Sequence, residues 1–285
     1  MSLRTAIGTV RRGMLSHLSS RRVPLGNAGP IVSFTFDDFP RTAYTVGAPI
    51  LQGFGARGTY YVTPGLMDKV NNLGEQYSSQ DLQNLVEQGH ELASHTHSHL
   101  SCREVPLHSF QADVRKGRQA ILDQMGIADS GNFAYPYGDV TLRAKQALGR
   151  EMLSCRGTTP GVNGPEVDLN LLRANGLYGD TAQLAAVQRL ILENEARKGW
   201  LVFYTHDVCS RPSRFGCTPV LLEAAVSFVA QGRASIVTVA DALTKLKAQA
   251  SDVSHLQIEQ ANGVSRRNGG LSRDFQNQGH PDCLR

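Results

Sequence analysis

The sequence predicts an α/β protein built as a (β/α) barrel, and three observations support this prediction. Apolar segments of strand length, rich in β-branched and aromatic residues, recur along the chain, as in residues 31–36 and 200–205. Segments with helical spacing of apolar residues lie between them. Several strand-like segments end directly in aspartate, histidine or a proline–glycine turn. A barrel of alternating strands and helices builds its active site in this way, at the carboxyl ends of its strands.

The elements can be assigned in chain order. Strands are expected at the segments 31–36, 57–63, 89–94, 132–135, 153–159, 171–177, 200–205 and within 234–246. Helices are expected over residues 78–88, 110–125, 184–191 and 220–228, and at the end of the segment 234–246. The first of these helices begins with the capping pair Ser78 and Asp81 and ends at Gly89. The pattern contains no internal repeat.

Length and composition agree with one barrel domain. The chain has 285 residues, of which 41% are hydrophobic, and barrels of roughly 250 residues are ordinary single domains. The formal net charge of +4 is too small to indicate a nucleic-acid-binding protein. No segment reaches the roughly 18 apolar residues of a membrane span. We expect a basic segment at residues 1–30, a barrel at 31–250 and a polar tail at 251–285.

The first 22 residues are rich in arginine and lack the uninterrupted apolar core of a secretory signal. They predict a basic amphipathic helix, either packed on the barrel or in peripheral contact with an anionic membrane surface. The five cysteines are odd in number and have no C-x-x-C spacing, so no disulfide framework is indicated. Cys209 and Cys217 flank one loop, and we expect two free thiols there rather than a disulfide. A cytoplasmic location is the simplest expectation.

Three alternate histidines, His95, His97 and His99, directly follow a short apolar run. On one helical turn His95 and His99 would point the same way, and in an extended segment all three would share a face. Either geometry suits a divalent metal, because neutral imidazole is a common zinc ligand. Taken alone, the segment also fits a polar loop that is rich in histidine.

Two adjacent carboxylates, Asp37 and Asp38, end the apolar segment 31–36. Ionised groups at the end of a buried strand require a cation or hydrogen bonds. One carboxylate could bind a metal while the other takes a proton, although an aspartate pair can also cap a turn. The segment 200–208 likewise ends in His206 and Asp207.

Four short motifs, taken in order, resemble those of the polysaccharide deacetylases of the NodB-homology type, carbohydrate esterase family 4. They are T-F-D-D at 35–38, H-T-x-x-H at 95–99, P-Y-G at 136–138 and T-H-D at 205–207. The resemblance extends from about residue 31 to about residue 246. It implies an irregular, TIM-like barrel with seven rather than eight strands.

The resemblance also implies a metal centre. Asp38, His95 and His99 match the family's ligands for a divalent metal, for which zinc is the expected ion, and His97 matches no ligand. Two imidazoles and one carboxylate leave open positions, as a catalytic metal site requires.

The resemblance assigns the other reacting groups as well. Asp37 matches the general base and His206 the general acid that protonates the departing amine. Tyr137 follows the motif proline at the position where a backbone N–H helps to hold the oxyanion.

One departure concerns an arginine that pairs with the catalytic base in the family. The family has it two residues before the motif proline, where this chain has Ala134. Another arginine could take its place. Arg173 in the strand-like segment 171–177 is our first candidate, and Arg156 is the second.

Two further departures weaken the assignment of the substrate more than that of the metal. Phe39 and Pro40 follow the aspartate pair where the family usually has Gly-Pro. The family's fourth motif, which contains Asp and Trp, has no clear match, and Asp168 and Asp180 are the nearest acidic residues.

The predicted function is a metal-dependent hydrolase that removes N-acetyl groups from N-acetylated sugars or polysaccharides. The partner is therefore an acetylated carbohydrate, and no nucleic acid is expected. One alternative is an amidohydrolase or deformylase that acts on another small or lipid-linked amide. A second alternative is a catalytically inactive carbohydrate-binding barrel, which Ala134 leaves open and the five polar site residues argue against.

Overall fold

The computed structural model describes residues 18–249. The N-terminal basic helix and its membrane contact, and the polar C-terminal tail, were predicted mainly for residues 1–17 and 250–285, which lie outside the described residues. Within the described part, the expectation of a helix reaching residue 22 is wrong. Residues 18 and 19 form a turn, and Arg22 begins strand β1 (Arg22–Pro24).

Strand β1 forms because its backbone has a partner far along the chain. It pairs antiparallel with β9 (Glu166–Asp168). Arg21 strengthens the pairing, since its backbone N–H donates to Asp168 Oδ1 at 3.0 Å and its guanidinium donates to the backbone carbonyl of Met152. The backbone groups of residues 21–24 therefore form hydrogen bonds with β9 and its surroundings instead of the hydrogen bonds of the predicted helix.

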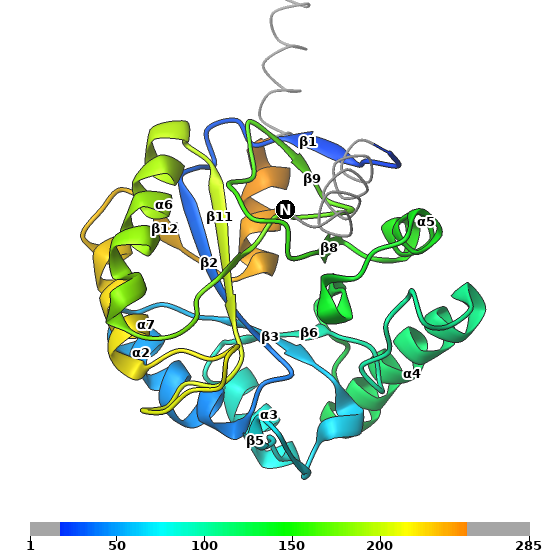
Figure 1. The fold of residues 1–285 in the computed structure, drawn as a ribbon. Coiled ribbons are helices and arrows are strands. Elements are labelled where there is room, and N and C mark those ends of the chain that lie inside the picture. The colour runs from blue at the N-terminus through cyan, green and yellow to red at the C-terminus, as the bar shows by residue number, and fades with distance from the viewer. Residues whose placement is uncertain (1–17, 250–285) are drawn as a thin grey trace, which may run out of the picture. The chain divides into compact units, whose positions relative to one another are not determined.

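Seven parallel strands form a strongly curled sheet (Figure 1), as the sequence predicted. Their order across the sheet is β10–β11–β2–β3–β6–β7–β8. The bounds are β2 (Ile31–Asp37), β3 (Thr59–Val62), β6 (Glu91–Ser94), β7 (Asn132–Ala134), β8 (Ser154–Arg156), β10 (Asn175–Gly176) and β11 (Trp200–Thr205). A short strand, β12 (Ser235–Ile236), pairs with the first half of β2, and β4 (Val70–Asn71) pairs with β5 (Gly74–Glu75) in a separate hairpin.

The two edges of the curled sheet are linked by residues 172–177. Leu172 forms a parallel bridge with Arg156 at the end of β8, while Asn175 in β10 pairs with Phe203 of β11. The sheet is therefore an irregular barrel in which one extended segment contacts both edges.

Helices cover the outside of the sheet (Figure 1). They are α2 (Ala48–Gly53), α3 (Ser79–Glu87), α4 (Leu107–Met125), α5 (Leu142–Glu151), α6 (Leu184–Arg197) and α7 (Pro219–Ala230), and another helix begins at residue 239. Short helical turns η1 (Ala43–Gly47), η2 (Pro64–Leu66), η3 (Pro136–Gly138) and η4 (Thr181–Gln183) lie in the connections. The predicted capping box is present at α3, where the Ser78 and Asp81 side chains bond each other's backbone N–H groups.

The core explains the apolar strand patterns. Every residue of β2 is buried, as expected of a strand covered on both faces. The Phe34 ring stacks on Phe203 of the neighbouring β11, and the Trp200 indole N–H donates to Ser33 Oγ at 3.0 Å. The carboxyl ends of these strands thus rest on a rigid base.

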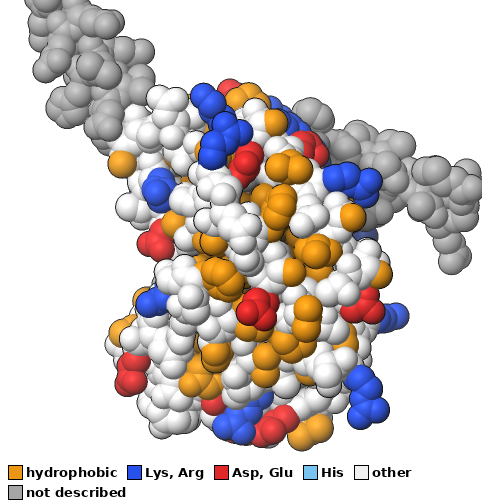
Figure 2. Space-filling view, turned by 90° about the vertical axis from the view of Figure 1, so that its left-hand side faces the viewer, with side chains coloured by type: hydrophobic (Ala, Val, Ile, Leu, Met, Phe, Trp, Pro, Cys, Tyr) orange, Lys and Arg blue, Asp and Glu red, His pale blue; other side chains and the backbone are white. Residues whose placement is uncertain are grey.

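The outer helical face shows scattered hydrophobic side chains among polar and charged ones (Figure 2). Isolated exposed apolar residues of this kind are normal for a folded domain. Within residues 18–249, none of the helices has the length and apolar character needed to cross a bilayer.

Candidate active site

The predicted site residues, with one exception, line one cavity of about 390 Å³ at the carboxyl ends of the strands. Asp37 ends β2 and Asp38 follows it, His95 and His99 follow β6, Tyr137 lies in η3, and His206 follows β11. The cavity is lined by Asp37, Asp38, Leu66, Asn71, Asn72, Leu73, His95, His99, Tyr135, Tyr137, Gly138, Thr158, Tyr178, Tyr204, His206, Arg214 and Phe215. Segments as far apart in the sequence as residues 37 and 215 therefore meet at this end of the barrel.

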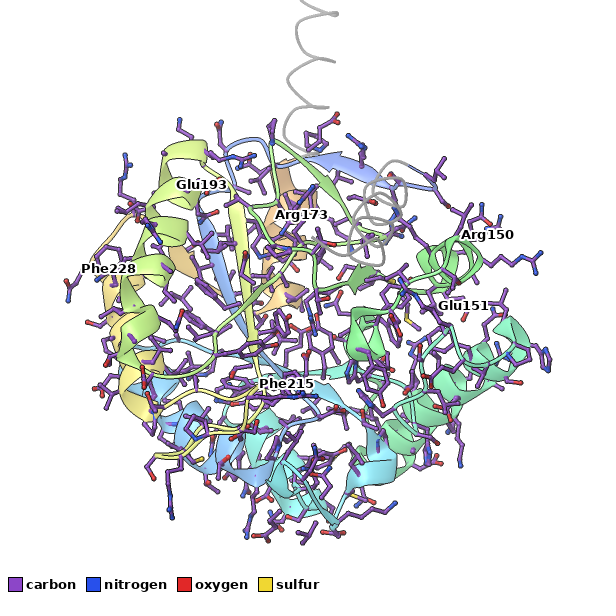
Figure 3. All side chains as sticks on the ribbon, in the orientation of Figure 1. Arg150, Glu151, Arg173, Glu193, Phe215 and Phe228 are labelled. Carbon is purple, nitrogen blue, oxygen red and sulfur yellow. The ribbon has the colours of Figure 1, made fainter. Side chains whose placement is uncertain are left out.

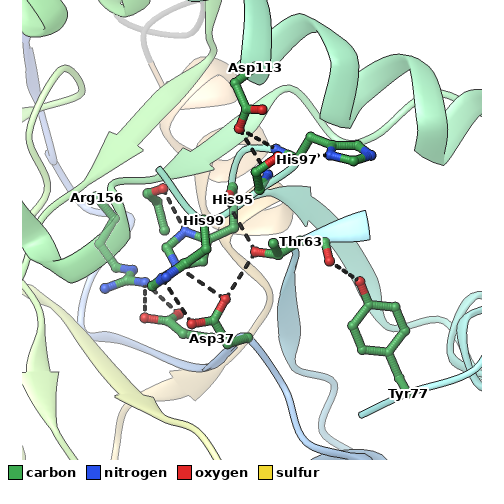
Figure 4. A network of polar contacts seen from close by, with 11 residues as sticks. Asp37, Thr63, Tyr77, His95, His97, His99, Asp113 and Arg156 are labelled. Atoms are coloured by element: carbon green, nitrogen blue, oxygen red, sulfur yellow. Dashed lines mark hydrogen bonds and ion pairs between the residues drawn. The ribbon is translucent and has the colours of Figure 1, made fainter. Parts of the chain in front are cut away.

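The candidate metal ligands form a tight group. One ligand atom from each of Asp38, His95 and His99 lies within 4.8 Å of the others, and this is the single such cluster among residues 18–249. His99 Nε2 lies 2.9 Å from Asp38 Oδ2, and His95 Nε2 lies 3.9 Å from Asp38 Oδ1. The centres of the His95 and His99 rings are 5.1 Å apart, and Figure 4 shows the two imidazoles next to each other.

Neighbouring groups orient these side chains. The His95 Nδ1–H donates to the Ala134 carbonyl at 2.7 Å, which leaves the Nε2 lone pair free to face the cluster. The Thr63 hydroxyl donates to Asp38 Oδ1 at 3.0 Å. Because a metal-binding histidine typically donates its other ring N–H to an oxygen, the arrangement fits a divalent ion.

The protonation of the cluster also fits a metal. Burial lowers the pKa of His95 to about 4, so its imidazole is neutral at neutral pH. Burial alone would raise the pKa of Asp38, but the hydrogen bond from His99 and the nearby imidazoles hold it below its usual value. Two imidazole nitrogens and one carboxylate oxygen are ligand atoms that suit zinc and related divalent ions.

The candidate base Asp37 is held by an arginine. Its carboxylate is 4% exposed, and both of its oxygens accept from Arg156 Nη2, at 2.5 Å and 2.6 Å. Arg156 is itself buried between two rings, with its guanidinium carbon 4.9 Å from the centre of the Tyr61 ring and 5.0 Å from that of Tyr204. The negative charge of Asp37 raises the pKa of Arg156 against the effect of burial, so the guanidinium remains charged.

The first choice of arginine, Arg173, is therefore wrong, and the second choice, Arg156, contacts the base. Residues 172 and 174 are buried while Arg173 is exposed, so its side chain leaves the barrel and donates to the Pro160 carbonyl at 2.9 Å. It lines a different cavity, next to Arg22 and Glu166. Figure 3 shows Arg173 well away from Phe215, which borders the catalytic cavity.

The position of Arg156 explains why this chain can have alanine at position 134, where the resemblance leads one to expect an arginine. In the register of β7 and β8, Ala134 pairs directly with Arg156. The arginine thus reaches the base from the neighbouring strand at the same level of the sheet. The small Ala134 side chain packs with Ala93 and Tyr61 and leaves room for the guanidinium.

Strained backbone is concentrated around the cavity. Among residues 18–249, the non-glycine residues with positive φ include Asp38 (44°), Thr96 (65°), His99 (55°) and Tyr137 (59°). Left-handed backbone is unfavourable for such residues and persists where surrounding structure enforces it, often at functional sites. The Tyr137 ring lies with its centre 4.3 Å from that of His99 and is 66% exposed at the cavity mouth.

The candidate acid His206 is fixed by the loop that follows it. Its backbone N–H donates to the Phe215 carbonyl at 3.1 Å, and its Nδ1 lies 3.2 Å from the same oxygen. Since a carbonyl only accepts, Nδ1 carries the proton and Nε2 is the atom available at the cavity.

Three other residues considered in the sequence lie outside the cavity. The His97 backbone N–H donates to the Asp113 carboxylate at 3.0 Å, and its ring borders a separate hollow near α4 (Figure 4). Asp168 pairs with Lys145 at 2.7 Å, and Asp180 caps η4. Neither aspartate has the surroundings of the family's missing fourth motif.

Sequence reasoning missed several cavity residues. Tyr204 stands two positions before His206 on β11, and the two-residue period of a strand could have placed both on one face. Thr63, which does not line the cavity but donates to Asp38, directly follows β3 and could have been found by the same rule as Asp38. Tyr178 and Arg214 lie in irregular segments, where no periodic signal exists.

The geometry can now be compared with known proteins. The sequence model of the family described as polysaccharide deacetylase matches residues 26–152, which include the aspartate pair, the histidine motif and the P-Y-G turn. The resemblance is therefore confirmed for these three motifs, whereas the fourth, T-H-D at 205–207, lies beyond the matched residues. Among proteins with curated descriptions, none matches the chain significantly.

Solved structures with the same fold agree. The Xyl-CE4 domain of a multidomain xylanase from the hindgut metagenome of Trinervitermes trinervoides is 19% identical, with a TM-score of 0.52 over 76% of this chain and 91% of that one. A variant of the peptidoglycan deacetylase PdaC from Bacillus subtilis is 15% identical, with a TM-score of 0.51 over 82% of this chain and 98% of that one. At these identities the likeness establishes the fold, an α/β barrel of the NodB type.

Proposed function

Because residues 26–152 carry the polysaccharide deacetylase pattern on a NodB-type barrel, we propose that the protein is a metal-dependent hydrolase that removes N-acetyl groups from N-acetylated sugars or polysaccharides. The observation that best supports this is a single cavity containing two adjacent carboxylates with different partners. Asp38 faces two imidazoles, whereas Asp37 faces a buried guanidinium. We therefore assign Asp38 to metal binding and Asp37 to proton transfer.

The residues divide the reaction between them. A divalent ion held by Asp38, His95 and His99 would supply Lewis acidity for the amide carbonyl and for the attacking water. Asp37 takes the proton of that water, and Arg156 holds the carboxylate in position for this transfer.

The opposite wall of the cavity completes the chemistry. In its doubly protonated form, with a second proton taken from solvent on Nε2, His206 gives the Nε2 proton to the departing amine and returns to the neutral form whose Nδ1–H donates to the Phe215 carbonyl. The backbone N–H of Tyr137, in the strained turn η3, stabilises negative charge on the former carbonyl oxygen.

Acetate release tests the proposal. The full chain, loaded separately with zinc, cobalt and nickel, is incubated with N-acetylated chito-oligosaccharides, an O-acetylated xylan and an N-formylated sugar. We expect acetate from the N-acetylated substrate, loss of release on chelation, and recovery when the ion returns. Formate but no acetate would replace the proposal with a deformylase. No product from any substrate with a fully loaded site would favour the inactive binding barrel.

A further inference from the structure

The loop between His206 and α7 presents an arginine, Arg214, to the substrate cavity. Arg214 lines the catalytic cavity together with Tyr178. The same two residues also line a second hollow, of about 430 Å³, beside η4 and α6. They therefore stand where a substrate extending from the first hollow to the second would pass.

The loop that carries Arg214 is held firmly. The Asp207 carboxylate is buried and accepts from the Ser213 backbone N–H at 2.7 Å and from the Ser213 hydroxyl at 2.5 Å. Gly216 packs on the same carboxylate, because a Cβ there would lie 2.3 Å from Asp207 Oδ1. Backbone bonds between residues 207–209 and Cys217 close the loop at its base.

Phe215 connects the arginine with the candidate acid. The guanidinium carbon of Arg214 lies 4.4 Å from the centre of the Phe215 ring, while the Phe215 carbonyl accepts from His206. A guanidinium held over an aromatic face keeps its N–H donors in its own plane, available to a ligand. The cation is thus pre-organised beside the group that protonates the leaving amine.

The Arg214 guanidinium stacks on the Phe215 ring and has no charged partner among the described residues. No carboxylate of residues 18–249 lies within ion-pair distance of it, whereas Arg156 is buried and paired with Asp37. The two acidic groups of the cavity, Asp37 and Asp38, are engaged with Arg156 and with the imidazoles. An arginine fork without a partner suits a carboxylate or phosphate, which it binds through two parallel hydrogen bonds.

We infer that Arg214 selects substrates in which the N-acetylated sugar, or the unit linked directly to it, carries an anionic oxygen group. This inference rests on the proposed deacetylase function and specifies its substrate class. The sugar amide occupies the catalytic cavity, the anion binds the Arg214 guanidinium, and the remaining substrate continues into the hollow beside α6.

The test compares matched substrates that differ in charge. They are a neutral N-acetylglucosamine oligosaccharide, a counterpart whose sugar bears a carboxylate, and one that bears a phosphate. The wild-type protein should have the higher kcat/KM for an anionic substrate, and the better of the two identifies the group. Arg214→Gln should lower the ratio of anionic to neutral kcat/KM about 10- to 100-fold, as expected for hydrogen bonds to a charged group.

Two controls separate this effect from others. Arg211→Gln removes a charge from the same loop at an exposed position outside both hollows, and should leave the ratio unchanged. Arg214→Lys keeps the charge without the fork and should give an intermediate ratio. An unchanged ratio in Arg214→Gln, an equal fall in Arg211→Gln, or a wild-type preference for the neutral substrate would overturn the inference.

Binding keeps the inference testable if no hydrolysis is found. Calorimetric titration of the same three sugars into the metal-loaded Asp37→Asn protein should show tighter binding of an anionic sugar, and this preference should be lost with Arg214→Gln. Equal affinities for the neutral and anionic sugars would contradict the role of Arg214. Absence of turnover alone would count only against the deacetylase function.

Discussion

Two buried ion pairs occupy different regions of this barrel, and their surroundings differ. Asp37 and Arg156 meet at the cavity, whereas Lys145 of α5 pairs at 2.7 Å with Asp168 of β9. The Lys145 side chain is 0% exposed, and Asp168 Oδ1 also accepts from the backbone N–H groups of Arg21 and Asn170. The second pair therefore joins a helix to two distant segments of backbone.

Buried polar atoms without hydrogen-bond partners lie beside both pairs, and beside Asp168 they are Arg21 Nε and Asn170 Oδ1. Arg156 Nε and the Tyr61 hydroxyl next to it are buried without hydrogen-bond partners. Buried polar atoms are normally paired, and exceptions often occur at functional sites. Because both pairs have such neighbours, the difference between them is one of position: Asp37 lines the cavity, whereas Lys145 and Asp168 do not.

The largest effect is expected from Asp37→Asn. A carboxamide cannot accept the proton of the attacking water, so kcat should fall about 10²- to 10⁴-fold, the usual contribution of general base catalysis. Metal content should remain that of the wild type, because Asp38 and the two imidazoles are intact. Wild-type turnover in this variant would exclude Asp37 as the base.

The second prediction removes Arg156 and then places an arginine at position 134 on the neighbouring strand. Arg156→Ala should lower kcat at least about tenfold, because a hydrogen-bonded charged partner of the base is lost. Since Ala134 pairs with Arg156 in the β7–β8 register, the double variant Arg156→Ala/Ala134→Arg should recover part of this loss. Arg173→Ala is the matched control, and its turnover should stay close to that of the wild type. A larger effect of Arg173→Ala than of Arg156→Ala would refute the assignment.

The third prediction concerns the other ion pair. Lys145→Met leaves the Asp168 charge buried without its cation and should lower the free energy of unfolding by about 3 kcal/mol. Asp168→Asn in the same chain keeps the acceptor for Arg21 and Asn170 and should restore part of that loss. Denaturant titration measures both, and kcat of the folded protein should not change. A loss of turnover at an unchanged free energy of unfolding would show that the Lys145–Asp168 pair also affects the reaction in the cavity.

The smallest effect is expected in the pH dependence of the free energy of unfolding, and it comes from His90, which lies outside the cavity. Burial lowers the pKa of His90 from 6.5 to about 4, and its Nδ1 accepts from the Gly58 backbone N–H at 2.9 Å. The unfolded chain therefore binds the additional proton between pH 6.5 and 4, so stability is present above this range and decreases as the pH falls through it. The loss from pH 7 to pH 5 should be about 2 kcal/mol. Chemical denaturation at both pH values should show a smaller difference in His90→Gln, and an equal difference would contradict this origin.

Much of the fold could be predicted because its signals are local. The buried strand before Asp37, the capping box of α3 and the apolar run before His206 each depend on neighbouring residues. Strand β1 could not be predicted in this way, because its stability comes from β9, which lies far along the chain. A basic stretch without its partner was therefore interpreted as a helix.

The same distinction applies to the site. Asp38 and His95 directly follow neighbouring parts of the parallel sheet, and His99 lies in the segment that continues from His95, so the sheet brings the three together. The choice between Arg156 and Arg173 depended on the register of β8 and on the outward direction of the Arg173 side chain, neither of which a single sequence contains. Arg214 is positioned by the bonds between Asp207 and Ser213, so its place at the cavity depended on the geometry of one loop.

Metal content across the histidine variants tests the central claim most directly. Elemental mass spectrometry of the purified full chain should find one divalent ion in the wild type and in His97→Ala, whose ring lies outside the cavity. His95→Ala and His99→Ala should each lose the ion while remaining folded, because each removes one of three ligands. Full occupancy in both of these variants, or loss of the ion only in His97→Ala, would contradict the proposed metal centre.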